Sequence, residues 1–399
     1  MSVNEKYIQV IENIHKELMM SEHSKTIGLH AGTSGVALYL AYYGRIIRQS
    51  NTIEPRVMEI LEYNIEQINS GNLQHTICSG ISGFGWLCCH LRKLGMLNSE
   101  DVEFLDDLDI FLYRKMMADI KQGNYDYLHG ALGVGTYFLS RFDKKNVSLY
   151  LHDLFTELEL SGIPCENGAI KWISVLYPET GEKGYNISLS HGMSSIIAFF
   201  IRLYQLNFET ERVGKLLIGA VTYILDQITY VEGCISYFPS VAKESSAGNY
   251  FSRLGWCYGD LGIAHILLQA SVVLKNKEWE NTALQILRHN SKRRDLKKNL
   301  IKDAGLCHGS AGIAYIFWNL YLKTNIQEFR ETVDYWLEVT KQMATYPDGL
   351  AGFKAWRMEK IGGPTNSDSL LEGIAGIGLV LLSRLKSEET TWDECLMLS

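Results

Sequence analysis

Three residues in the second half of the chain have the chemistry of metal ligands: Cys257, Cys307 and His308. Cys307 and His308 are neighbours in the stretch GLCHGSAGIA (305–314), and Cys257 lies in the similar stretch WCYGDLGIA (256–264). Two thiolates and one imidazole suit a tetrahedral zinc ion with three protein ligands and one open position, which is typical of catalytic zinc. The residue types therefore predict one zinc ion per chain, with a position left for a substrate atom.

The charge of this ligand set indicates which substrate atom the zinc would activate. Zinc lowers the pKa of a bound thiol from roughly 8.5, so that the sulfur binds as a thiolate. Two cysteine thiolates already neutralise the metal, so a substrate sulfur bound there stays nucleophilic. A site with three histidines would favour the activation of water instead. The ligand set therefore predicts thiol chemistry.

A repeat in the sequence predicts the elements that bring these residues together. A Gly-x-x-Gly pattern occurs seven times, and its first glycines are Gly32, Gly80, Gly130, Gly192, Gly259, Gly309 and Gly373. An apolar stretch follows each copy and predicts a buried helix with the glycines at its first turn, while polar amphipathic segments between copies predict outer helices. The fourth copy has Ser195 in place of the second glycine, which makes the start of that helix less certain.

Two helices per repeat and seven repeats predict an all-α fold, an α/α toroid of about fourteen helices in two layers. We expect one domain over residues 1–399, with the repeats between about 27 and 383. Three long connections, 163–190, 232–256 and 347–371, are expected to be loop insertions, and the first two favour short β-hairpins. An open α-solenoid is the alternative architecture.

In a toroid, equivalent positions of all repeats meet at the same end of the ring. The position two residues before each first glycine holds His30, Cys78, Leu128, Ser190, Cys257, Cys307 and Leu371. The position one residue before holds Ala31, Ser79, His129, His191, Tyr258, His308 and Glu372. The repeat thus predicts that cysteines and histidines far apart in the chain gather at one rim.

Several cysteines and rim residues keep a structural interpretation. Cys78 and His129 are open between packing and a role in the site, and His30 and Glu372 are expected to be structural or capping residues. A cysteine in an apolar helix usually packs as a small core residue. This expectation covers Cys88, Cys89, Cys165, Cys234 and Cys395.

Composition and charge exclude several classes of function. The net charge of −7 disfavours nucleic acid as a partner, because phosphate binding needs a basic surface. No apolar run reaches the roughly 20 residues that a membrane span needs. The N-terminal stretch is amphipathic and lacks the apolar segment of a signal peptide, so we expect a cytoplasmic protein. Eight cysteines in 399 residues do not make a disulfide scaffold.

The stretch Arg253-Leu-Gly-Trp-Cys-Tyr-Gly259 and the triplet Cys307-His-Gly309, within a sevenfold Gly-x-x-Gly repeat, resemble the lanthionine synthetase C-like proteins. More narrowly, they are similar to stand-alone (class I) lanthipeptide cyclases of the nisin-cyclase type. The resemblance covers nearly the whole chain. It implies an α/α toroid and a zinc enzyme that adds precursor-peptide cysteine thiols to dehydroalanine or dehydrobutyrine, closing thioether rings.

The resemblance also implies roles for individual residues. The zinc ligands would be Cys257, Cys307 and His308. The catalytic histidine would be His191, in Ser190-His-Gly192, and the aspartate beside it would be Asp126. Arg253 would stabilise the enolate formed on addition, and Tyr258 would donate a hydrogen bond. From the residues alone, Asp126 is also suited to cap a helix, Tyr258 to packing and Arg253 to the surface.

The implied partners are a dehydrated precursor peptide with its leader, a separate dehydratase and an ABC exporter. Such a complex would hold the protein at the inner face of the membrane. The loops 163–190 and 347–371 are candidates for binding the leader. Two other functions compete: an enzyme of the same superfamily that adds glutathione to dehydrated residues, and a non-catalytic peptide scaffold. A toroidal glycosidase would need two facing carboxylates and would leave the Cys–His group unexplained.

Overall fold

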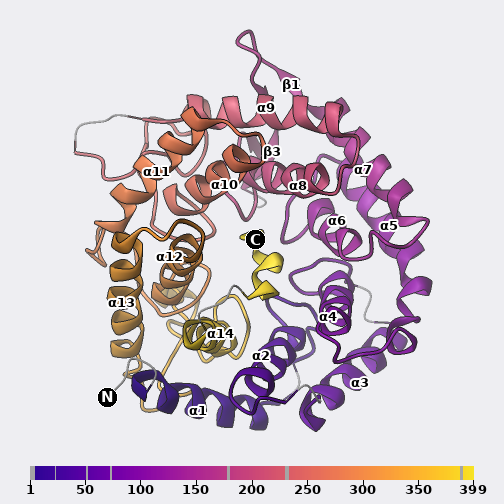
Figure 1. The fold of residues 1–399 in the computed structure, drawn as a ribbon, viewed down its shortest axis with the longest axis vertical. Coiled ribbons are helices and arrows are strands. Elements are labelled where there is room, and N and C mark those ends of the chain that lie inside the picture. The colour runs from indigo at the N-terminus through magenta and orange to yellow at the C-terminus, as the bar shows by residue number, and fades with distance from the viewer. Residues whose placement is uncertain are drawn as a thin grey trace. The chain divides into compact units, whose positions relative to one another are not determined.

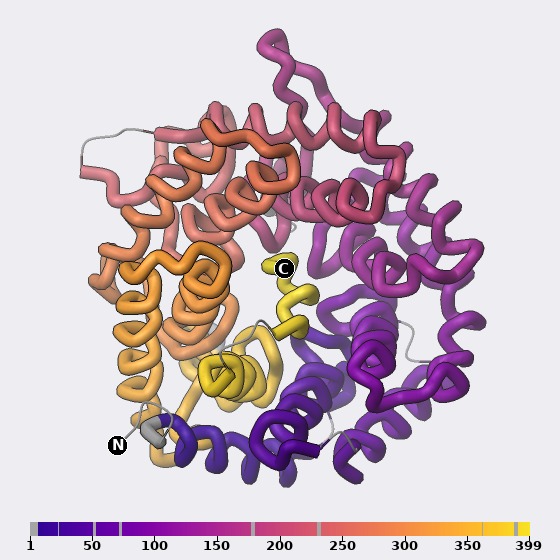
Figure 2. The backbone as a smooth tube through the Cα atoms, in the orientation of Figure 1, coloured from indigo at the N-terminus to yellow at the C-terminus, as the bar shows by residue number. Residues whose placement is uncertain are grey.

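A computed structural model describes residues 5–22, 24–50, 53–71, 74–177, 180–229, 233–386 and 390–399. The described chain contains fourteen α-helices and two small β-hairpins. It packs as two compact units, Met1–Leu112 with Ile301–Glu394, and Tyr113–Leu300 with Cys395–Ser399. Their backbones are traced in Figure 2. The second hairpin is interrupted by residues 178–179, which lie outside the described part.

The first unit is built from helices at both ends of the chain. Its α-helices are α1 (Glu5–Met20), α2 (Thr33–Ile46), α3 (Pro55–Asn69), α4 (Ile81–Lys93), α12 (Ser310–Thr324), α13 (Gln327–Gln342) and α14 (Ile374–Leu385). The apolar helices α2, α4, α12 and α14 lie in one layer, and the amphipathic helices α1, α3 and α13 cover them (Figure 1). The short helices η1 (Glu100–Val102), η3 (Glu359–Ile361) and η4 (Thr391–Leu396) lie in connections and at the C-terminal end.

The second unit repeats the same alternation. Its helices are α6 (Ala131–Leu139), α7 (Val147–Ser161), α8 (Met193–Gln205), α9 (Thr210–Asp226), α10 (Asp260–Val273) and α11 (Lys277–Ser291), with η2 (Lys243–Ser245), and α5 (Leu105–Lys121) crosses the boundary of the units. The apolar helix α8 packs against α10 and α9. Two antiparallel hairpins follow α7: β1 (Ile163–Pro164) with β2 (Ile170–Lys171), and β3 (Ser174–Tyr177) with β4 (Glu182–Gly184).

The glycines of the repeat begin the apolar helices, as the sequence predicts. All seven first glycines are the N-cap residues of α2, α4, α6, α8, α10, α12 and α14. A Cβ atom on the second glycine would collide with the preceding loop, since one on Gly312 would lie 1.8 Å from the Leu306 carbonyl oxygen. Ser195 leaves the helix start unchanged, because α8 still begins directly after Gly192.

The loops before these helices are joined by backbone hydrogen bonds at equivalent repeat positions. In the first unit, His30 N–H donates to Cys78 (3.1 Å), Leu371 N–H to His30 (3.0 Å) and Cys307 N–H to Leu371 (2.8 Å). In the second unit, Ser190 N–H donates to the Cys257 carbonyl (3.3 Å). The residues two positions before the first glycine therefore lie side by side in four repeats of the first unit and in two repeats of the second, as the repeat predicts.

The long connections agree with expectation in one case and not in another. The connection 163–190 carries both β-hairpins, as predicted. The expected hairpin in 232–256 is wrong for the described residues 233–256, which contain η2 and no strand. The reason is that the Tyr237 and Phe238 N–H groups donate to the Asp260 carboxylate instead of a neighbouring strand. Glu232 lies outside the described residues. The connection 347–371 holds η3 and two isolated bridges.

The cysteines expected in the core divide into two groups. Cys88, Cys89 and Cys395 are buried, as predicted. Cys165 and Cys234 are only half-buried, so the core interpretation is wrong for them. Cys165 lies in the turn between β1 and β2, and Cys234 lies in the connection before η2, where its thiol contacts the Tyr250 carbonyl (3.5 Å). No helix in the described part of the chain is both long and apolar enough to cross a membrane.

Candidate functional site

The three residues predicted to hold a metal ion form one group. Cys257 lies two residues before Gly259, the N-cap of α10, and Cys307 and His308 directly precede Gly309, the N-cap of α12. Their candidate ligand atoms, two Sγ and one imidazole nitrogen, all lie within 4.8 Å of one another. Both cysteines are buried, and His308 is half-buried. Cys78, which shares the repeat position of the two cysteines, is not part of this group.

The geometry of this group fits a tetrahedral metal ion. Zinc–sulfur bonds of about 2.3 Å and zinc–nitrogen bonds of about 2.0 Å place the ligand atoms of one zinc roughly 3.5 Å apart. Side chains whose ligand atoms lie within 4.8 Å of one another reach that spacing with small adjustments. Two thiols and an imidazole are also the donors that zinc prefers. The cluster is therefore a candidate metal site, with three protein ligands.

An aspartate that the sequence analysis missed supports the histidine of this group. One carboxylate oxygen of Asp303 lies 3.9 Å from Nε2 of His308 and accepts the Trp356 N–H at 2.8 Å. The other oxygen accepts the Gly305 N–H at 3.0 Å. Asp303 therefore fixes the loop before His308 and lies close to its ring. Carboxylates commonly hold the histidines of metal sites in this neighbourhood.

Asp303 occupies a repeat position that the sequence analysis did not use. It stands six residues before the first glycine, where the other repeats have Thr26, Gln74, Asn124, Asn186, Arg253 and Ser367. In each repeat a backbone or side-chain atom of this residue lies close to the glycine that begins the helix. Extending the repeat six residues upstream would therefore have found it.

His191 and Asp126 form a direct pair in the second unit. His191 Nδ1 lies 2.6 Å from one oxygen of Asp126, and the other oxygen accepts the His129 N–H at 2.8 Å. The carboxylate thus both caps the turn before α6 and orients the histidine, so the two interpretations of Asp126 are compatible. Burial lowers the pKa of His191, but the hydrogen bond and charge of Asp126, with the charge of Cys257, outweigh it and raise the pKa above its usual value.

A cavity of about 610 Å³ opens beside this pair. Its lining includes Asp126, His129, His191 and Tyr258, together with Ser174–Leu176 of strand β3 and Asn186. Two of the expected site residues, His191 and Tyr258, thus share one wall, with ring centroids 5.9 Å apart. Burial raises the pKa of the Tyr258 hydroxyl, so this group stays neutral and remains a hydrogen-bond donor.

His129, which the sequence left open, lies in the same cavity. Its ring stacks on that of His191, with centroids 6.0 Å apart. Burial lowers the pKa of His129, partly offset by Asp126, which favours the neutral ring at physiological pH. The two stacked rings therefore differ, since the pKa of His129 is lowered and that of His191 is raised.

Arg253 lies outside the cavity lining, and Asn186 is a lining residue that the sequence did not single out. The Arg253 side chain is half-buried and is not among the residues that line the cavity. Its carbonyl oxygen packs against Gly259, where a Cβ atom would lie 2.1 Å away. Asn186 was missed, although its side-chain amide donates to the Tyr258 hydroxyl (3.4 Å) and its side-chain oxygen accepts the Ser188 N–H (2.9 Å).

The two expected structural rim residues lie in the first unit. His30 is fully buried, and its carbonyl accepts the Leu371 N–H. Glu372 forms an ion pair with Arg357. Both residues thus take part in packing or ion pairing, in line with the structural interpretation.

Comparisons with known proteins agree with this arrangement. The chain is 23% identical over 396 residues to the nisin biosynthesis protein NisC of Lactococcus lactis subsp. lactis, covering 93% of this chain and 88% of that protein. It is 28% identical over 217 residues to glutathione S-transferase LANCL1 of Danio rerio, covering 52% of this chain and 47% of that protein. The solved structure of nisin cyclase superposes with a TM-score of 0.76 at 19% identity, over 99% of this chain and 98% of that one.

The structural likeness confirms the predicted fold class, an α/α toroid. The family model for lanthionine synthetase C-like proteins matches residues 23–397, which is nearly the full length. The match includes both units, every helix that begins at a repeat glycine, and the cluster of Cys257, Cys307 and His308. The chain therefore belongs to the lanthionine synthetase C-like protein family.

Proposed function

We propose that the protein is a zinc-dependent lanthipeptide cyclase, acting as a single domain. It would add cysteine thiols of a dehydrated precursor peptide to dehydroalanine or dehydrobutyrine and form (methyl)lanthionine rings. The observation that carries the proposal is the group of Cys257, Cys307 and His308, whose ligand atoms lie within 4.8 Å of one another. Family membership and the His191–Asp126 pair support it further.

Different residues are proposed to serve thiol activation and enolate stabilisation. A zinc ion held by Cys257, Cys307 and His308 would lower the pKa of a substrate thiol and hold its sulfur as a thiolate. When that sulfur bonds to the β-carbon, the double-bond electrons move onto the neighbouring carbonyl oxygen. Tyr258 then offers its neutral hydroxyl to the enolate oxygen, and Arg253 is proposed to supply positive charge.

His191 is the proposed proton donor to the enolate carbon. Its Nδ1 is engaged by Asp126 at 2.6 Å, so Nε2 is the nitrogen left to deliver a proton. Asp126 keeps the imidazole protonated to a higher pH, because its hydrogen bond and negative charge raise the pKa of His191. A raised pKa suits a general acid, because the imidazole has to carry its proton before it can donate it. The proton lost by the substrate thiol balances the proton gained by the carbon.

The proposed setting follows from the substrate. We propose a cytoplasmic enzyme that receives its peptide from a separate dehydratase and passes it to an ABC exporter at the inner face of the membrane. The leader of the peptide would bind the loops 163–190 and 347–371. Block replacement of exposed residues in β3–β4 and in η3 should weaken leader binding without changing zinc content. Unchanged leader binding by both variants would refute this assignment.

A second candidate function is the addition of glutathione to dehydrated residues. It is favoured by the similarity to glutathione S-transferase LANCL1 over 217 residues. The same thiol-activating site would serve, with glutathione in place of the peptide cysteine. The two functions differ in the source of the thiol, which one assay can separate.

The test uses two short peptides, each with one dehydroalanine, of which only one also contains a cysteine. Purified protein with zinc is given each peptide, with and without glutathione, and the products are identified by mass spectrometry after alkylation of free thiols. A cyclase protects the peptide cysteine from alkylation without a change in mass. A glutathione-adding enzyme increases the mass of the cysteine-free peptide by one glutathione. If neither product forms, the proposed function is refuted and the scaffold interpretation remains.

A further inference from the structure

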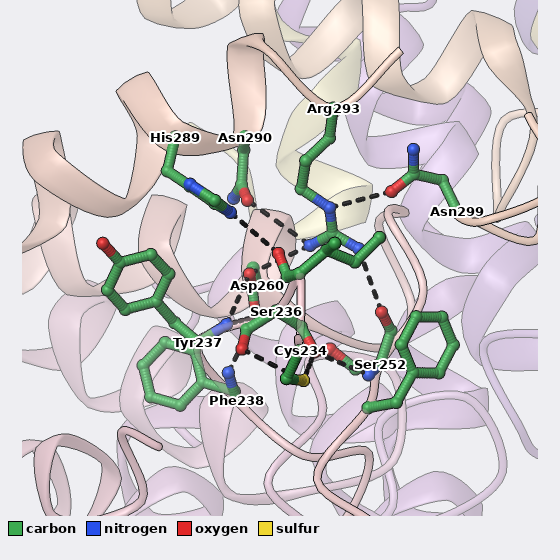
Figure 3. Close-up of polar contacts among 12 residues, drawn as sticks. Cys234, Ser236, Tyr237, Phe238, Ser252, Asp260, His289, Asn290, Arg293 and Asn299 are labelled. Atoms are coloured by element: carbon green, nitrogen blue, oxygen red, sulfur yellow. Dashed lines mark hydrogen bonds and ion pairs between the residues drawn. The ribbon is translucent and has the colours of Figure 1, made fainter. Parts of the chain in front are cut away.

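The fifth repeat contains a buried ion pair that the proposed mechanism does not use. Asp260 is the first residue of α10, and Arg293 follows the end of α11; Nη1 of Arg293 lies 2.9 Å from Oδ2 of Asp260. The exposed fractions of the two side chains are 0% for Asp260 and 4% for Arg293. Figure 3 shows the two side chains and their polar contacts. The two carboxylate oxygens also accept the Tyr237 and Phe238 N–H groups at 2.9–3.0 Å.

The other two guanidinium nitrogens of Arg293 bind groups that hold the segment before Cys257. Nη2 donates to the Ser252 carbonyl at 3.0 Å, and Nε donates to the Asn299 side chain at 2.8 Å. The Asn299 carbonyl in turn accepts the Leu254 N–H at 3.3 Å. The backbone is therefore held on both sides of Arg253, at Ser252 and Leu254. Asp260, directly after Tyr258 and Gly259, is held by the Tyr237 and Phe238 N–H groups.

The segment between these attachments carries the fifth repeat's contribution to the candidate site. Residues 253–259 include Arg253, the metal-ligand candidate Cys257 and Tyr258, and both ends of the segment are tied to one guanidinium–carboxylate pair. Gly259 has φ of 93°, the only positive φ among the seven first glycines of the repeat. The residues after the other first glycines, Thr33, Ile81, Ala131, Met193, Ser310 and Ile374, carry no charge.

Stability alone is a weak reason for such a pair. Removing two charges from water is costly, and apolar residues of similar volume often stabilise a fold equally well. What an apolar pair cannot do is bond four separate backbone and side-chain groups in fixed directions, as a planar guanidinium facing a carboxylate does. The pair is also neutral overall, so it fixes the loop without adding net charge beside the thiols.

We propose that Asp260 and Arg293 are a positioning pair that sets the backbone of residues 253–258, and with it the Cys257 sulfur. Neither residue touches the substrate; both act through Cys257. This inference rests on the proposed function, because Cys257 matters there as a metal ligand. Outer-shell partners of metal ligands typically contribute about 10- to 100-fold in metal affinity or activity.

The test compares zinc affinity, steady-state rates and melting temperature in two variants. Asp260→Asn keeps the shape of the side chain and removes its charge. Arg293→Lys keeps the positive charge and removes the planar guanidinium with its several donors. We expect zinc affinity, measured by competition with a chelator, to fall roughly 10-fold or more in each. We expect kcat in the peptide cyclisation assay to fall with it, while KM stays within about twofold, because the peptide-binding surface is untouched.

Two further variants separate positioning from stability. In the double variant Asp260→Asn with Arg293→Gln, no uncompensated charge is buried, so the melting temperature should largely recover. The shorter glutamine side chain cannot reach Ser252 and Asn299 together, so zinc affinity should stay low. Asp393→Asn is the matched control, since Asp393 in η4 is a fully buried carboxylate that accepts a 2.7 Å bond from the Asn319 side chain. It should lower the melting temperature and leave zinc affinity unchanged.

The possible outcomes are distinct. Wild-type zinc affinity in Asp260→Asn and Arg293→Lys, or full recovery of zinc affinity in the double variant, would overturn the positioning role and leave the proposed function intact. Failure of the unaltered protein to bind zinc and to cyclise the peptide would instead refute the proposed function. If Asp260→Asn does not fold, Arg293→Lys gives the same readings.

Discussion

Two loops of the second unit occupy the same place in the repeat and are held in different ways. The loop before α8 carries His191 and is held by neutral groups, chiefly the Asn186 side chain, which accepts the Ser188 N–H. The loop before α10 carries Cys257 and is held by the buried Asp260–Arg293 pair. The carboxylate of Asp126 contacts the first of these loops, at His191.

The difference follows from what each residue is proposed to do. His191 has to change its protonation state, so a carboxylate that raises its pKa is useful beside it. Cys257 has to keep a fixed position as a ligand, so rigidity matters and an extra net charge would not help. Two equivalent loops of the repeat are thus proposed to serve different steps, proton transfer from His191 in one and metal binding by Cys257 in the other, and the charges of the surrounding groups differ accordingly.

The largest expected effect separates the two loops by chemistry. Replacing His191→Asn should lower kcat by roughly 100- to 10,000-fold, because the proton donor is lost, while zinc content stays at the wild-type value. Replacing Cys257→Ser should remove zinc and activity together. Elemental analysis and the cyclisation assay on both variants test this. Loss of zinc in the His191 variant would contradict the division of roles.

The second prediction concerns the glycines. Gly259→Ala would force a side chain into a left-handed conformation, with its Cβ 2.1 Å from the Arg253 carbonyl, so we expect a loss of stability of about 1–3 kcal/mol or more. Ser195→Gly, at the second-glycine position inside the first turn of α8, should cost no more than about 1 kcal/mol. Denaturant unfolding measures both. Equal losses would mean that the two loops are under the same constraint.

The third prediction concerns pH. Asp126 raises the pKa of His191, so the protonated donor persists to a higher pH and the rate falls only as pH rises through that pKa. In Asp126→Asn this falling limb should move to lower pH, and the stability that protonated His191 contributes below its pKa should be reduced. A pH–rate profile of kcat for both proteins checks the direction. If the falling limb of the pH–rate profile does not move in Asp126→Asn, His191 is not the group whose titration limits the rate.

The smallest expected effect is at the contact between the loops. The Tyr258 hydroxyl accepts a long bond of 3.4 Å from Asn186, so Tyr258→Phe breaks a weak link and one proposed enolate contact. We expect kcat to fall about 5- to 10-fold, equivalent to roughly 1 kcal/mol. Tyr185→Phe, outside the cavity lining, is the matched control and should be near wild type.

The repeat made most of the fold predictable from the sequence. Its first glycines begin all seven apolar helices. A side chain at Gly312, a second glycine of the repeat, would collide with the Leu306 carbonyl, whereas α8 accommodates Ser195 at the equivalent position. The same alignment of the repeats predicted that Cys257, Cys307 and His308 lie together, although 50 residues separate the two cysteines. Periodicity of this kind carries long-range information that single motifs lack.

The parts that could not be predicted depend on side chains outside the repeat. Arg293 follows α11 in an irregular segment, and no local pattern links it to Asp260. The expected hairpin in 232–256 is absent from the described residues for the same reason, since Asp260 binds the Tyr237 and Phe238 N–H groups that a strand would have used. The role of the buried Asp260 carboxylate depends on groups that are distant in the sequence, so the sequence alone does not reveal it.

The most direct test of the central claim is the zinc content of the protein, purified without chelators, beside Cys307→Ala and Cys78→Ala. Cys78 is a buried cysteine at the same repeat position and lies outside the ligand group, so it controls for loss of a thiol. The account predicts one zinc ion in the unaltered protein and in Cys78→Ala, and none in Cys307→Ala. No zinc in the unaltered protein, or full zinc content in Cys307→Ala, would contradict it.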